Sequence, residues 1–160
     1  MIKTAIITIS DKGAEGSRED KSGRVIEKML SEFKAQKVYY NIIPDEVELI
    51  EKELKKICDK GNVDLIFTTG GTGFAPRDVT PEATLKVIEK EVPGIPEMMR
   101  AETISITPMA ALSRARSGIR KKTLIINLPG STKAVRECLD AIREVIPHGI
   151  DILKGNVTEH

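Results

Sequence analysis

Short apolar runs alternate with segments of helical periodicity along the chain. Thr4 to Ile9 is an apolar run that suits a buried strand, and apolar residues then recur at helical spacing from Val25 to Phe33. Lys37 to Ile43 predicts a second strand, and Val47 to Ile57 predicts an amphipathic helix that Gly61 can close. The beginning of the chain therefore predicts two strands, each followed by a helix.

The same alternation continues with more interruptions by proline and glycine. Leu65 to Thr69 predicts a third strand, and we expect a helix from Pro81 to about Glu91. A break at Pro93 to Pro96 separates this helix from a helical segment at Glu97 to Ile104. Lys122 to Leu128 predicts a further strand.

The last part of the chain predicts two helices, and the structure of one segment before them is left undecided. Apolar residues from Val135 to Ile142 form a helical stripe after Ser131, and we expect Pro147 to bend the chain into a last short helix. Residues 113–122 alternate poorly, so they fit either a hairpin arm or an antiparallel strand.

Strands that alternate with helices favour a mostly parallel sheet, because each connection crosses one face of the sheet and returns in the same direction. We therefore predict an α/β fold of three layers, α/β/α, with a mostly parallel, mixed sheet. A chain of 160 residues suits a single domain, and we predict one that spans residues 1–160. Such a domain can bury about 70% of the surface of its unfolded chain.

The composition favours a small-molecule ligand. Lys and Arg total 25 against 24 for Asp and Glu, which gives a formal net charge of +1, and aromatic residues make up only 3%. Such a chain lacks the basic field and the stacking side chains typical of proteins that bind nucleic acid or an anionic membrane. The start of the sequence has no leader pattern and no apolar stretch of about 20 residues occurs, so we expect a cytoplasmic location.

The cysteines and histidines argue against a zinc site and against acyl-transfer chemistry. Cys58 and Cys138 lie in helical patterns far apart in the sequence, and we expect both in the core. The two histidines, His148 and His160, form neither a metal cluster nor an obvious triad with a nucleophile.

A glycine-rich loop follows the third predicted strand. Residues 68–81 read Thr-Thr-Gly-Gly-Thr-Gly-Phe-Ala-Pro-Arg-Asp-Val-Thr-Pro. Glycine allows positive φ and close approach of a ligand to the amides, while Thr80 and Pro81 suit the cap and first position of a helix. Amides and a helix N-terminus favour an anion. Arg77 could bind a phosphate and Asp78 a metal ion, so the loop suits a metal-bound phosphate.

The loop does not match two familiar phosphate motifs. Pro76 stands where the dinucleotide fingerprint needs a third glycine. Phe74 and Ala75 stand where the P-loop needs Lys followed by Ser or Thr. On this loop alone, a phosphate site and an ordinary strand-to-helix turn with nothing bound are both open.

Polar residues also follow the other predicted strands, at the positions where ligands of parallel sheets bind. Four strand ends can line one crevice: Ser10-Asp11, Pro44-Asp45, Gly70 to Gly73, and Pro129-Gly130-Ser131. Ser131 suits an N-cap, which is a structural role, but Gly130, Ser131 and Thr132 could also form a second anion site at a helix N-terminus. Two anion sites would suit a pair of substrates.

Structural roles are open for several of the acidic residues. Asp45 with Glu48 three positions later fits a capping box. Asp11 and Asp20 fit solvent-exposed loop positions. Asp78 precedes the expected cap by two residues, so it is too early to be the cap, although it could still interact favourably with the helix dipole from outside. A functional role is therefore better supported for Asp78 than for the others.

Several motifs along the chain together carry a family resemblance. After the glycines, residues 76–84 read Pro-Arg-Asp-Val-Thr-Pro-Glu-Ala-Thr. Further segments are Ile43-Pro44-Asp45-Glu46, Pro93-Gly94 with Glu97 and Met99-Arg100, Leu112-Ser113-Arg114, and Asn127 to Ser131. In content and order, these segments resemble the molybdopterin adenylyltransferases in their stand-alone bacterial and archaeal form. The first loop departs from the pattern, since Lys12 stands where many relatives have arginine.

The resemblance implies Mg²⁺-dependent transfer of AMP from ATP to molybdopterin, a dithiolene pterin, which gives adenylylated molybdopterin and pyrophosphate. The terminal phosphate of the pterin would attack the α-phosphorus of ATP, so the protein would position the substrates and neutralise charge. The resemblance also implies a homotrimer or larger assembly and hand-over of the product to a molybdenum insertase.

By matched position, the resemblance implies roles for individual residues. Asp45 and Asp78 would be catalytic, and Asp78 would organise Mg²⁺. The nucleotide phosphates would be held by Gly70, Gly71, Thr72 and Gly73. The first-loop pattern near the same crevice comprises Ser10, Asp20, Ser22 and Gly23. The pterin contacts would be Ser113, Gly130 and Ser131.

Two other functions stay open. A non-catalytic molybdopterin carrier or scaffold could share the fold, although the presence of both Asp45 and Asp78 favours an enzyme. A related metal-insertion domain is the third candidate, and it is weaker because such domains normally belong to longer, multidomain chains.

Overall fold

A six-stranded mixed sheet forms the middle layer of the protein. The computed structural model describes residues 1–157, so His160 lies outside the described part. The strands are β1 (Ile2–Ile9), β2 (Ala35–Ile43), β3 (Leu65–Thr69), β4 (Lys90–Glu91), β5 (Ser117–Arg120) and β6 (Thr123–Leu128). Their order across the sheet is β2-β1-β3-β6-β5-β4.

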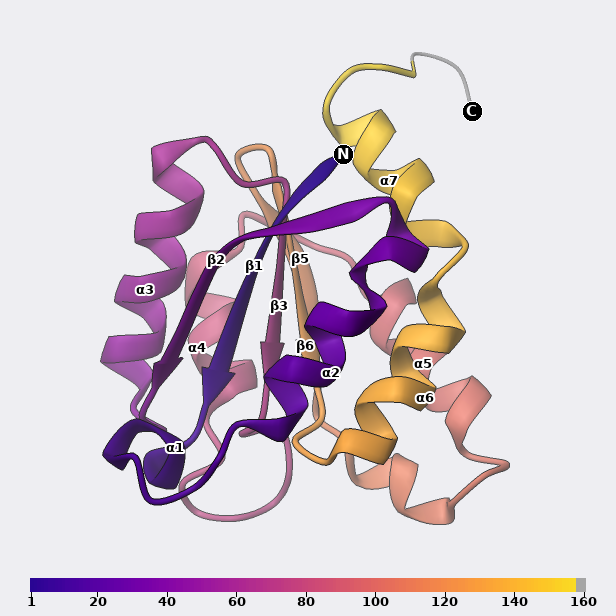
Figure 1. Ribbon diagram of the computed structural model, residues 1–160. Helices are drawn as coiled ribbons and strands as arrows, with labels where there is room; N and C mark the ends of the chain where they lie inside the picture. Colours follow the sequence, from indigo (N-terminus) through magenta and orange to yellow (C-terminus); the bar gives the residue numbers. More distant parts are fainter. Residues whose placement is uncertain (158–160) are drawn as a thin grey trace.

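The four strands β2, β1, β3 and β6 are parallel, as predicted. β5 runs antiparallel to β6, and β4 runs antiparallel to β5. The arrowheads of β2, β1 and β3 point to one edge of the molecule, the lower edge in Figure 1. The loops that leave these strands therefore gather at that edge, as the position of ligands in parallel sheets requires.

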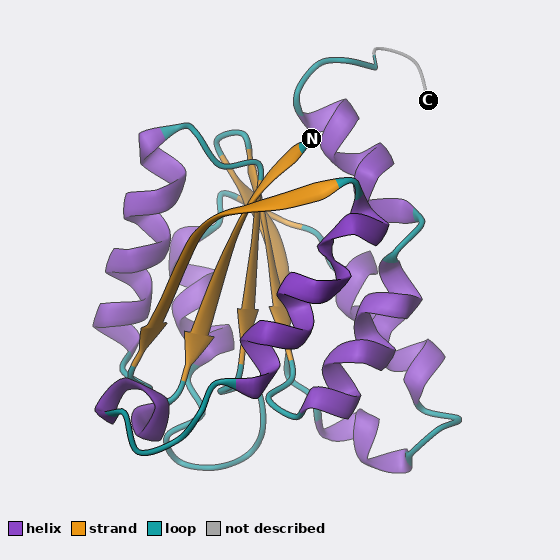
Figure 2. Cartoon of the chain, viewed as in Figure 1, coloured by secondary structure: helices purple, strands orange, loops and turns teal. Residues whose placement is uncertain are grey.

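Helices cover both faces of the sheet (Figures 1 and 2). They are α1 (Asp11–Glu15), α2 (Lys21–Met29), α3 (Val47–Lys60), α4 (Thr80–Val87), α5 (Gly94–Thr103), α6 (Thr132–Ile142) and α7 (Val145–Leu153). Two short 3-10 helices, Leu30–Phe33 and Pro108–Leu112, follow α2 and α5.

Alternating side chains of the strands divide the core into two clusters, one on each face. In β3, Leu65 and Phe67 pack with residues of α2, α5, α6 and α7, whereas Ile66 packs with residues of α3 and α4. Because successive strand residues point to opposite faces, a strand covered on both sides buries all of its side chains, and all five residues of β3 are buried. The three-layer α/β/α prediction is confirmed.

Differences from the predicted elements are local. α4 ends at Val87 rather than near Glu91, because Lys90 and Glu91 pair with β5 and form an edge strand. Gly118 permits this pairing, since a Cβ atom there would lie 2.7 Å from the Lys90 carbonyl oxygen. Of the open segment 113–122, residues 117–120 form the antiparallel strand β5.

Two helix boundaries also differ from expectation. The break at Pro93 to Pro96 is the start of α5, which begins at Gly94. Pro147 lies in the first turn of α7, where its missing N–H group would have no partner in the helix, and it therefore does not bend the chain ahead of the helix. The short helix α1 was not predicted, because its five residues bury no side chain.

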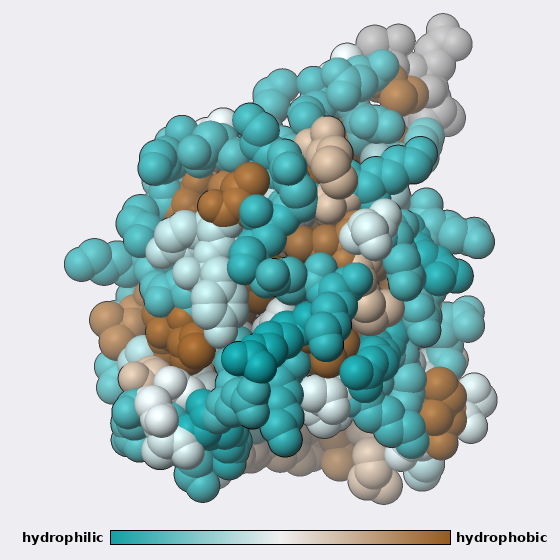
Figure 3. Space-filling model, viewed as in Figure 1, coloured by the Kyte–Doolittle hydropathy of each residue, from teal (hydrophilic) through white to brown (hydrophobic). Residues whose placement is uncertain are grey.

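The surface on the side of α2 is mainly hydrophilic, with separate hydrophobic patches (Figure 3). Within residues 1–157, no helix is long and apolar enough to cross a membrane.

Candidate active site

Two adjoining hollows lie where the parallel strands end. The polar hollow has a volume of about 750 Å³ and its lining includes Ser10, Asp20, Ser22, Asp45 and Gly70. The methionine hollow has a volume of about 490 Å³ and its lining includes Thr72, Gly73, Met99, Met109, Ser113 and Ser131. Asp78 and Gly130 line both hollows, so these two residues mark their junction.

The first loop is held together by its own side chains. Ser10 caps α1, where its hydroxyl accepts a hydrogen bond from the Gly13 N–H at 2.9 Å. Asp20 caps α2 and accepts from the Gly23 N–H at 2.9 Å. The Ser22 hydroxyl donates to the Gly130 carbonyl, which ties this loop to the loop after β6.

Asp20 is half-buried rather than exposed, because three groups bind its carboxylate. Besides the Gly23 N–H, the Thr8 hydroxyl donates to it at 2.7 Å and the Tyr40 hydroxyl also donates to it. Burial, and secondly the bond to Asp20, raise the pKa of the Tyr40 phenol. A Cβ atom at Gly23 would lie 2.2 Å from an Asp20 carboxylate oxygen, so glycine leaves the space that this carboxylate occupies. Gly23 itself lines neither hollow.

The glycine loop needs glycine at its first two positions. Gly70 has φ of 99°, and a Cβ atom there would lie 2.4 Å from the Ile9 carbonyl oxygen. Gly71 has φ of 71°, and its Cβ atom would lie 2.3 Å from the Thr80 hydroxyl oxygen. Positive φ and close approach of neighbouring atoms therefore both exclude larger residues.

Thr80 does not cap α4 as expected. It is the first residue of the helix, and Val79 occupies the cap position without a side-chain hydrogen bond. The Thr80 hydroxyl donates instead to the Gly70 carbonyl at 2.9 Å, and the Thr80 N–H donates to the Gly71 carbonyl at 3.1 Å. Thr80 thus fastens the glycine loop to the start of α4.

Asp45 is not a helix cap either. Glu46 holds the cap position of α3 and makes no side-chain capping bond. The Asp45 carboxylate accepts from the Asp11 N–H at 2.9 Å, and the Asp11 carboxylate accepts from the Asp45 N–H at 3.0 Å. Burial, aided by the charges of Asp11 and Asp78, raises the pKa of the Asp45 carboxyl. The capping box is therefore wrong, and Asp45 faces the polar hollow.

Arg77 binds a carboxylate in this structure. Its Nε and Nη2 atoms donate to the two Asp11 carboxylate oxygens at 3.0 and 2.9 Å. This bond lowers the pKa of the Asp11 carboxyl. The Arg77 side chain is 58% exposed, so a phosphate could compete for it with Asp11.

Asp78 lies at the junction of the hollows, on the loop that precedes α4. Its carboxylate accepts from the Ala75 N–H at 3.0 Å, and its own N–H donates to the Ala75 carbonyl at 2.9 Å. A Cβ atom at Gly73 would lie 2.9 Å from an Asp78 carboxylate oxygen. The loop folds back on itself and places this carboxylate beside the glycines.

On the other side, the methionine hollow brings together the three residues predicted to contact the pterin. Ser113 follows the 3-10 helix Pro108–Leu112, and Gly130 and Ser131 follow β6. Ser131 caps α6, as expected, by accepting from the Ala134 N–H at 3.2 Å. In that position Ser131 still lines the hollow.

Sequence reasoning from single loops missed Arg100 and Arg114. Arg100 lines the methionine hollow, and its guanidinium donates to the Ser113 and Ala115 carbonyls at 3.2 and 3.3 Å. Arg114 binds the glycine loop from outside the hollows. Both residues occur in the segments that carry the family resemblance, which was the available signal.

The acidic side chains fit a magnesium ion that also binds a substrate. Within residues 1–157, no three His, Cys, Asp or Glu side chains form a metal-binding group. Mg²⁺ is usually held by one or two carboxylates together with water and substrate phosphates, so it does not require such a group. Asp45 and Asp78, which both line the polar hollow, provide the two carboxylates.

Residues 5–148 match the family described as "Probable molybdopterin binding domain". A molybdopterin adenylyltransferase of Helicobacter pylori is 48% identical over 157 residues, which cover 97% of this chain and 89% of that protein. The molybdopterin biosynthesis enzyme MoaB from Thermus thermophilus has the same fold with a TM-score of 0.92 and 46% identity, covering 97% and 98% of the two chains. The tungsten cofactor synthesizing protein MoaB from Pyrococcus furiosus also shares the fold, with a TM-score of 0.83 and 38% sequence identity, covering 96% of each chain. The matched residues include every loop that lines the two hollows.

Proposed function

Because the chain belongs to the molybdopterin binding domain family, we propose that it transfers AMP from ATP to molybdopterin in the biosynthesis of the molybdenum cofactor. The observation that carries this proposal is the junction of the two hollows. Asp78 and Gly130 line both of them, next to a glycine loop suited to phosphate. A site with two compartments and one shared wall suits a reaction between two substrates.

The polar hollow is the nucleotide side of the proposed site. Gly70 lines this hollow, whereas Thr72 and Gly73 line the methionine hollow, so the loop from Gly70 to Gly73 would hold the nucleotide phosphates between the two hollows. Ser10, Asp20, Ser22 and Gly23 shape the first loop on the nucleotide side. The methionine hollow receives the pterin, which contacts Ser113, Gly130 and Ser131. Met99 and Met109 give this side an adaptable, polarisable wall that suits a flat heterocycle with sulfur substituents.

The proposed reaction requires no nucleophile from the protein. An oxygen of the pterin phosphate forms a bond to the α-phosphorus of ATP, and the bond from that phosphorus to the β-phosphate bridging oxygen breaks, releasing pyrophosphate. Cys138 lines the methionine hollow, but burial raises the pKa of its thiol to about 11, so it stays protonated at neutral pH. The residues of the site bind, orient and neutralise charge.

Asp45 and Asp78 are the proposed catalytic residues, and Asp78 is the first choice as a ligand of Mg²⁺. Two carboxylates beside a phosphate-binding loop would repel the substrates unless a cation lay between them. When bound, Mg²⁺ would neutralise phosphate charge in the transition state. The pKa of the Asp45 carboxyl is raised, and shifted pKa values are common among carboxylates of functional sites.

The wider setting is part of the same proposal. We place the protein in the cytoplasm, as a homotrimer or larger assembly whose product passes to a molybdenum insertase. These statements rest on the resemblance of the whole chain to the molybdopterin adenylyltransferases.

The direct test is product formation by the purified protein. We expect ATP, molybdopterin and Mg²⁺ to give pyrophosphate and adenylylated molybdopterin in equal amounts, with mass spectrometry identifying the pterin product. Omission of molybdopterin should abolish pyrophosphate release, which separates adenylyl transfer from simple ATP hydrolysis. Removal of Mg²⁺ with EDTA should stop the reaction, and Mg²⁺ in excess should restore it.

A negative result would also be informative. Tight binding of molybdopterin without any pyrophosphate release would identify a carrier or scaffold and would refute the enzyme proposal. Light scattering of the same preparation gives the subunit number, and a monomer under all conditions would contradict the proposed assembly.

A further inference from the structure

Arg114 makes four hydrogen bonds, and three of them bind carbonyl groups of one loop. Its N–H donates to the Thr72 carbonyl at 2.9 Å. Its Nε and Nη2 atoms donate to the Gly73 and Asp78 carbonyls, both at 2.8 Å. Its Nη1 atom binds the Glu82 carboxylate at 2.6 Å. One residue thus spans the loop from the glycines to Asp78.

Thr80 binds the two preceding carbonyls of the same loop. Its hydroxyl holds Gly70 and its N–H holds Gly71. Thr80 and Arg114 together therefore bind the carbonyls of four consecutive residues, 70–73. These carbonyls belong to four successive peptide groups.

The N–H groups of these four peptides point the opposite way. In a trans peptide the C=O and N–H bonds are antiparallel, and the protein has no cis peptide bond among residues 1–157. Fixing the carbonyls of residues 70–73 therefore fixes the N–H groups of Gly71, Thr72, Gly73 and Phe74. Within the described part of the chain, these four N–H groups have no hydrogen-bond acceptor. Successive unpaired N–H groups are a typical anion-binding arrangement.

We propose that Arg114 is a positioning residue. Together with Thr80 it orients the N–H groups of the glycine loop by binding the carbonyls of the same peptide groups, and its side chain also holds Asp78 through the Asp78 carbonyl. This inference rests on the proposed adenylyl transfer. Arg114 does not touch the substrates in this proposal, because each of its three guanidinium nitrogens binds a protein group and Arg114 lines neither hollow. Its effect reaches the phosphates through the peptide groups and through Asp78, and electrostatic preorganisation of this kind acts on the transition state.

The neighbouring residues provide matched controls. Arg116 lies two residues away, and its guanidinium binds the Glu91 carboxylate without touching the loop. Its side chain is 46% exposed, compared with 33% for Arg114. Glu82 binds only the Nη1 atom of Arg114, so Glu82→Gln removes the ion pair and leaves the carbonyl bonds of Nε and Nη2 in place.

Steady-state kinetics with both substrates tests the inference. We expect Arg114→Gln to lower kcat about 100-fold, the size of effect that a displacement of about 1 Å in a site produces. The KM for molybdopterin should change less than about threefold, because Thr72, Gly73 and Asp78 form only part of the wall of the pterin hollow. Arg116→Gln and Glu82→Gln should both behave as wild type. Arg114→Lys should remain close to Arg114→Gln, since one ammonium group cannot bind three separated acceptors.

Hydrogen exchange gives a readout that does not depend on turnover. The Asp78 and Thr80 N–H groups donate to carbonyls inside the loop, and we expect them to exchange faster in Arg114→Gln but not in Arg116→Gln. Suppose that exchange is faster in Arg114→Gln but the wild type shows no turnover. Arg114 would then still be the residue that holds the loop, and only the enzymatic proposal would be refuted.

Three results would overturn the inference. The first is unchanged exchange of the loop in Arg114→Gln. The second is full activity despite faster exchange. The third is full recovery of kcat by Arg114→Lys, which would show that charge alone is required. If Arg114→Gln is too unstable to assay, the Arg114→Lys exchange and kinetic data decide the same questions.

Discussion

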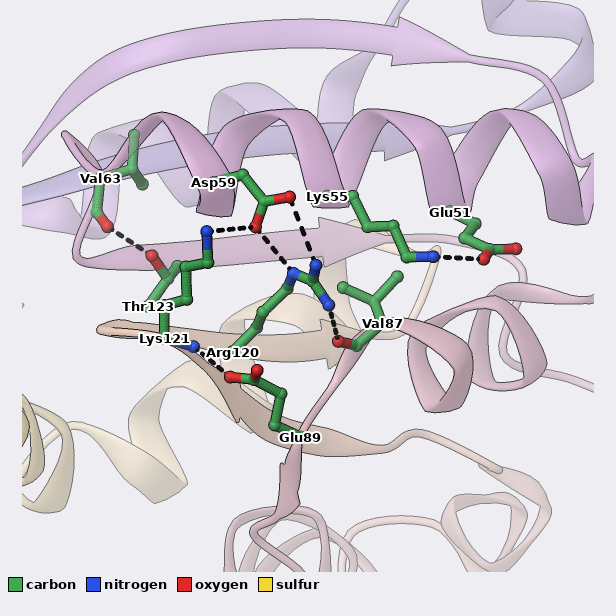
Figure 4. Close-up of polar contacts among 9 residues, drawn as sticks. All are labelled: Glu51, Lys55, Asp59, Val63, Val87, Glu89, Arg120, Lys121 and Thr123. Carbon is green, nitrogen blue, oxygen red and sulfur yellow. Dashed lines mark hydrogen bonds and ion pairs between the residues drawn. The ribbon is translucent and has the colours of Figure 1, made fainter.

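The two ends of the sheet carry the same type of ion pair in different surroundings. At the carboxyl ends of the strands, Arg77 binds both oxygens of Asp11. At the opposite end, Arg120 binds both oxygens of Asp59 and also donates to the Val87 carbonyl at 3.0 Å (Figure 4). The Arg120 side chain is 20% exposed, whereas that of Arg77 is 58% exposed.

The difference in exposure indicates that the Arg120 pair stabilises the fold, whereas Arg77 can exchange its carboxylate partner for a ligand. Arg120 links β5 to α3 and to the end of α4, and Figure 4 shows Lys121 and Glu89 extending this network. The contacts of Arg77 are carboxylates beside the polar hollow, and a phosphate can replace them. The same chemistry therefore stabilises one end of the molecule and leaves the other end available for ligands.

Removal of one carboxylate from each end should give the largest contrast. We expect Asp78→Asn to lower kcat by at least about 100-fold, because the proposed site then loses a carboxylate that would act on developing charge in the transition state. Its melting temperature should stay near that of the wild type. Asp59→Asn should keep full activity and melt at a lower temperature, because Arg120 and Lys121 lose their shared partner.

Circular dichroism melts and the pyrophosphate assay on the same preparations measure both properties. Full activity of Asp78→Asn would contradict the comparison, because this carboxylate would then have no role in the reaction. An inactive but folded Asp59→Asn would break it from the other side, because it would show that the closed network controls catalysis.

Glycine substitutions compare the backbone of the two ends. Gly70 and Gly61 both have positive φ, but a Cβ atom at Gly70 would meet the Ile9 carbonyl oxygen at 2.4 Å, while at Gly61 nothing lies within 4 Å. Gly61→Ala should cost about 1 kcal/mol of unfolding free energy, the cost of left-handed backbone alone. Gly70→Ala adds a clash with fixed backbone and should cost about 3 kcal/mol. Urea denaturation gives both values, and equal costs would contradict the proposed tight contact between the β1 and β3 ends.

Truncation of the two arginines should give a smaller effect with opposite signatures. Arg120→Ala removes the donor to the Val87 carbonyl, and we expect a loss of about 1–2 kcal/mol in unfolding free energy with unchanged kinetics. Arg77→Ala should leave the urea midpoint almost unchanged, because exposed ion pairs contribute little. It should instead raise the KM for ATP, which the pyrophosphate assay reports. A large loss of unfolding free energy in Arg77→Ala would show that the pair of Arg77 and Asp11 also stabilises the fold.

How far the sequence predicts the fold depends on how local the determining contacts are. Apolar runs and helical stripes predicted the four parallel strands and the main helices, since burial on both faces of a strand leaves a clear pattern. The edge strand β4 was missed, because two exposed residues carry no pattern and only their pairing with β5 defines them. The short helix α1 was missed for a similar reason.

The same limit applies to the candidate site. Glycines and polar strand ends were visible in the sequence, and the structure gathers them at one edge. The partners of Asp45 and Thr80 were not visible, because Asp45 bonds across 34 positions to Asp11 and Thr80 bonds across 10 positions to Gly70. Local rules therefore assigned both residues as caps. Arg114 was invisible as a loop contact for the same reason, since it reaches Gly73 across 41 positions.

The smallest expected effect concerns the pH dependence of stability, and its sign should differ between the two ends. Burial raises the pKa of the Asp45 carboxyl above its unfolded value, so keeping it ionised destabilises the folded protein above that pKa. The hydrogen bond from Arg120 lowers the pKa of the Asp59 carboxyl, so its ionisation stabilises the folded protein above the unfolded pKa. That contribution is lost as the pH falls through the lowered pKa.

Asp45→Asn should therefore raise the melting temperature at neutral pH, by less than the ~2–4 °C that about 1 kcal/mol gives in a domain of this size. The gain should disappear as the pH falls through the raised pKa to the ordinary aspartate range near ~4. Asp59→Asn should lower the melting temperature at neutral pH, and its deficit should shrink at acid pH. Melts of both variants from neutral to acid pH measure the two signs. A loss of stability in Asp45→Asn at neutral pH would show that its bond to the Asp11 N–H outweighs burial, and the two ends would then be alike.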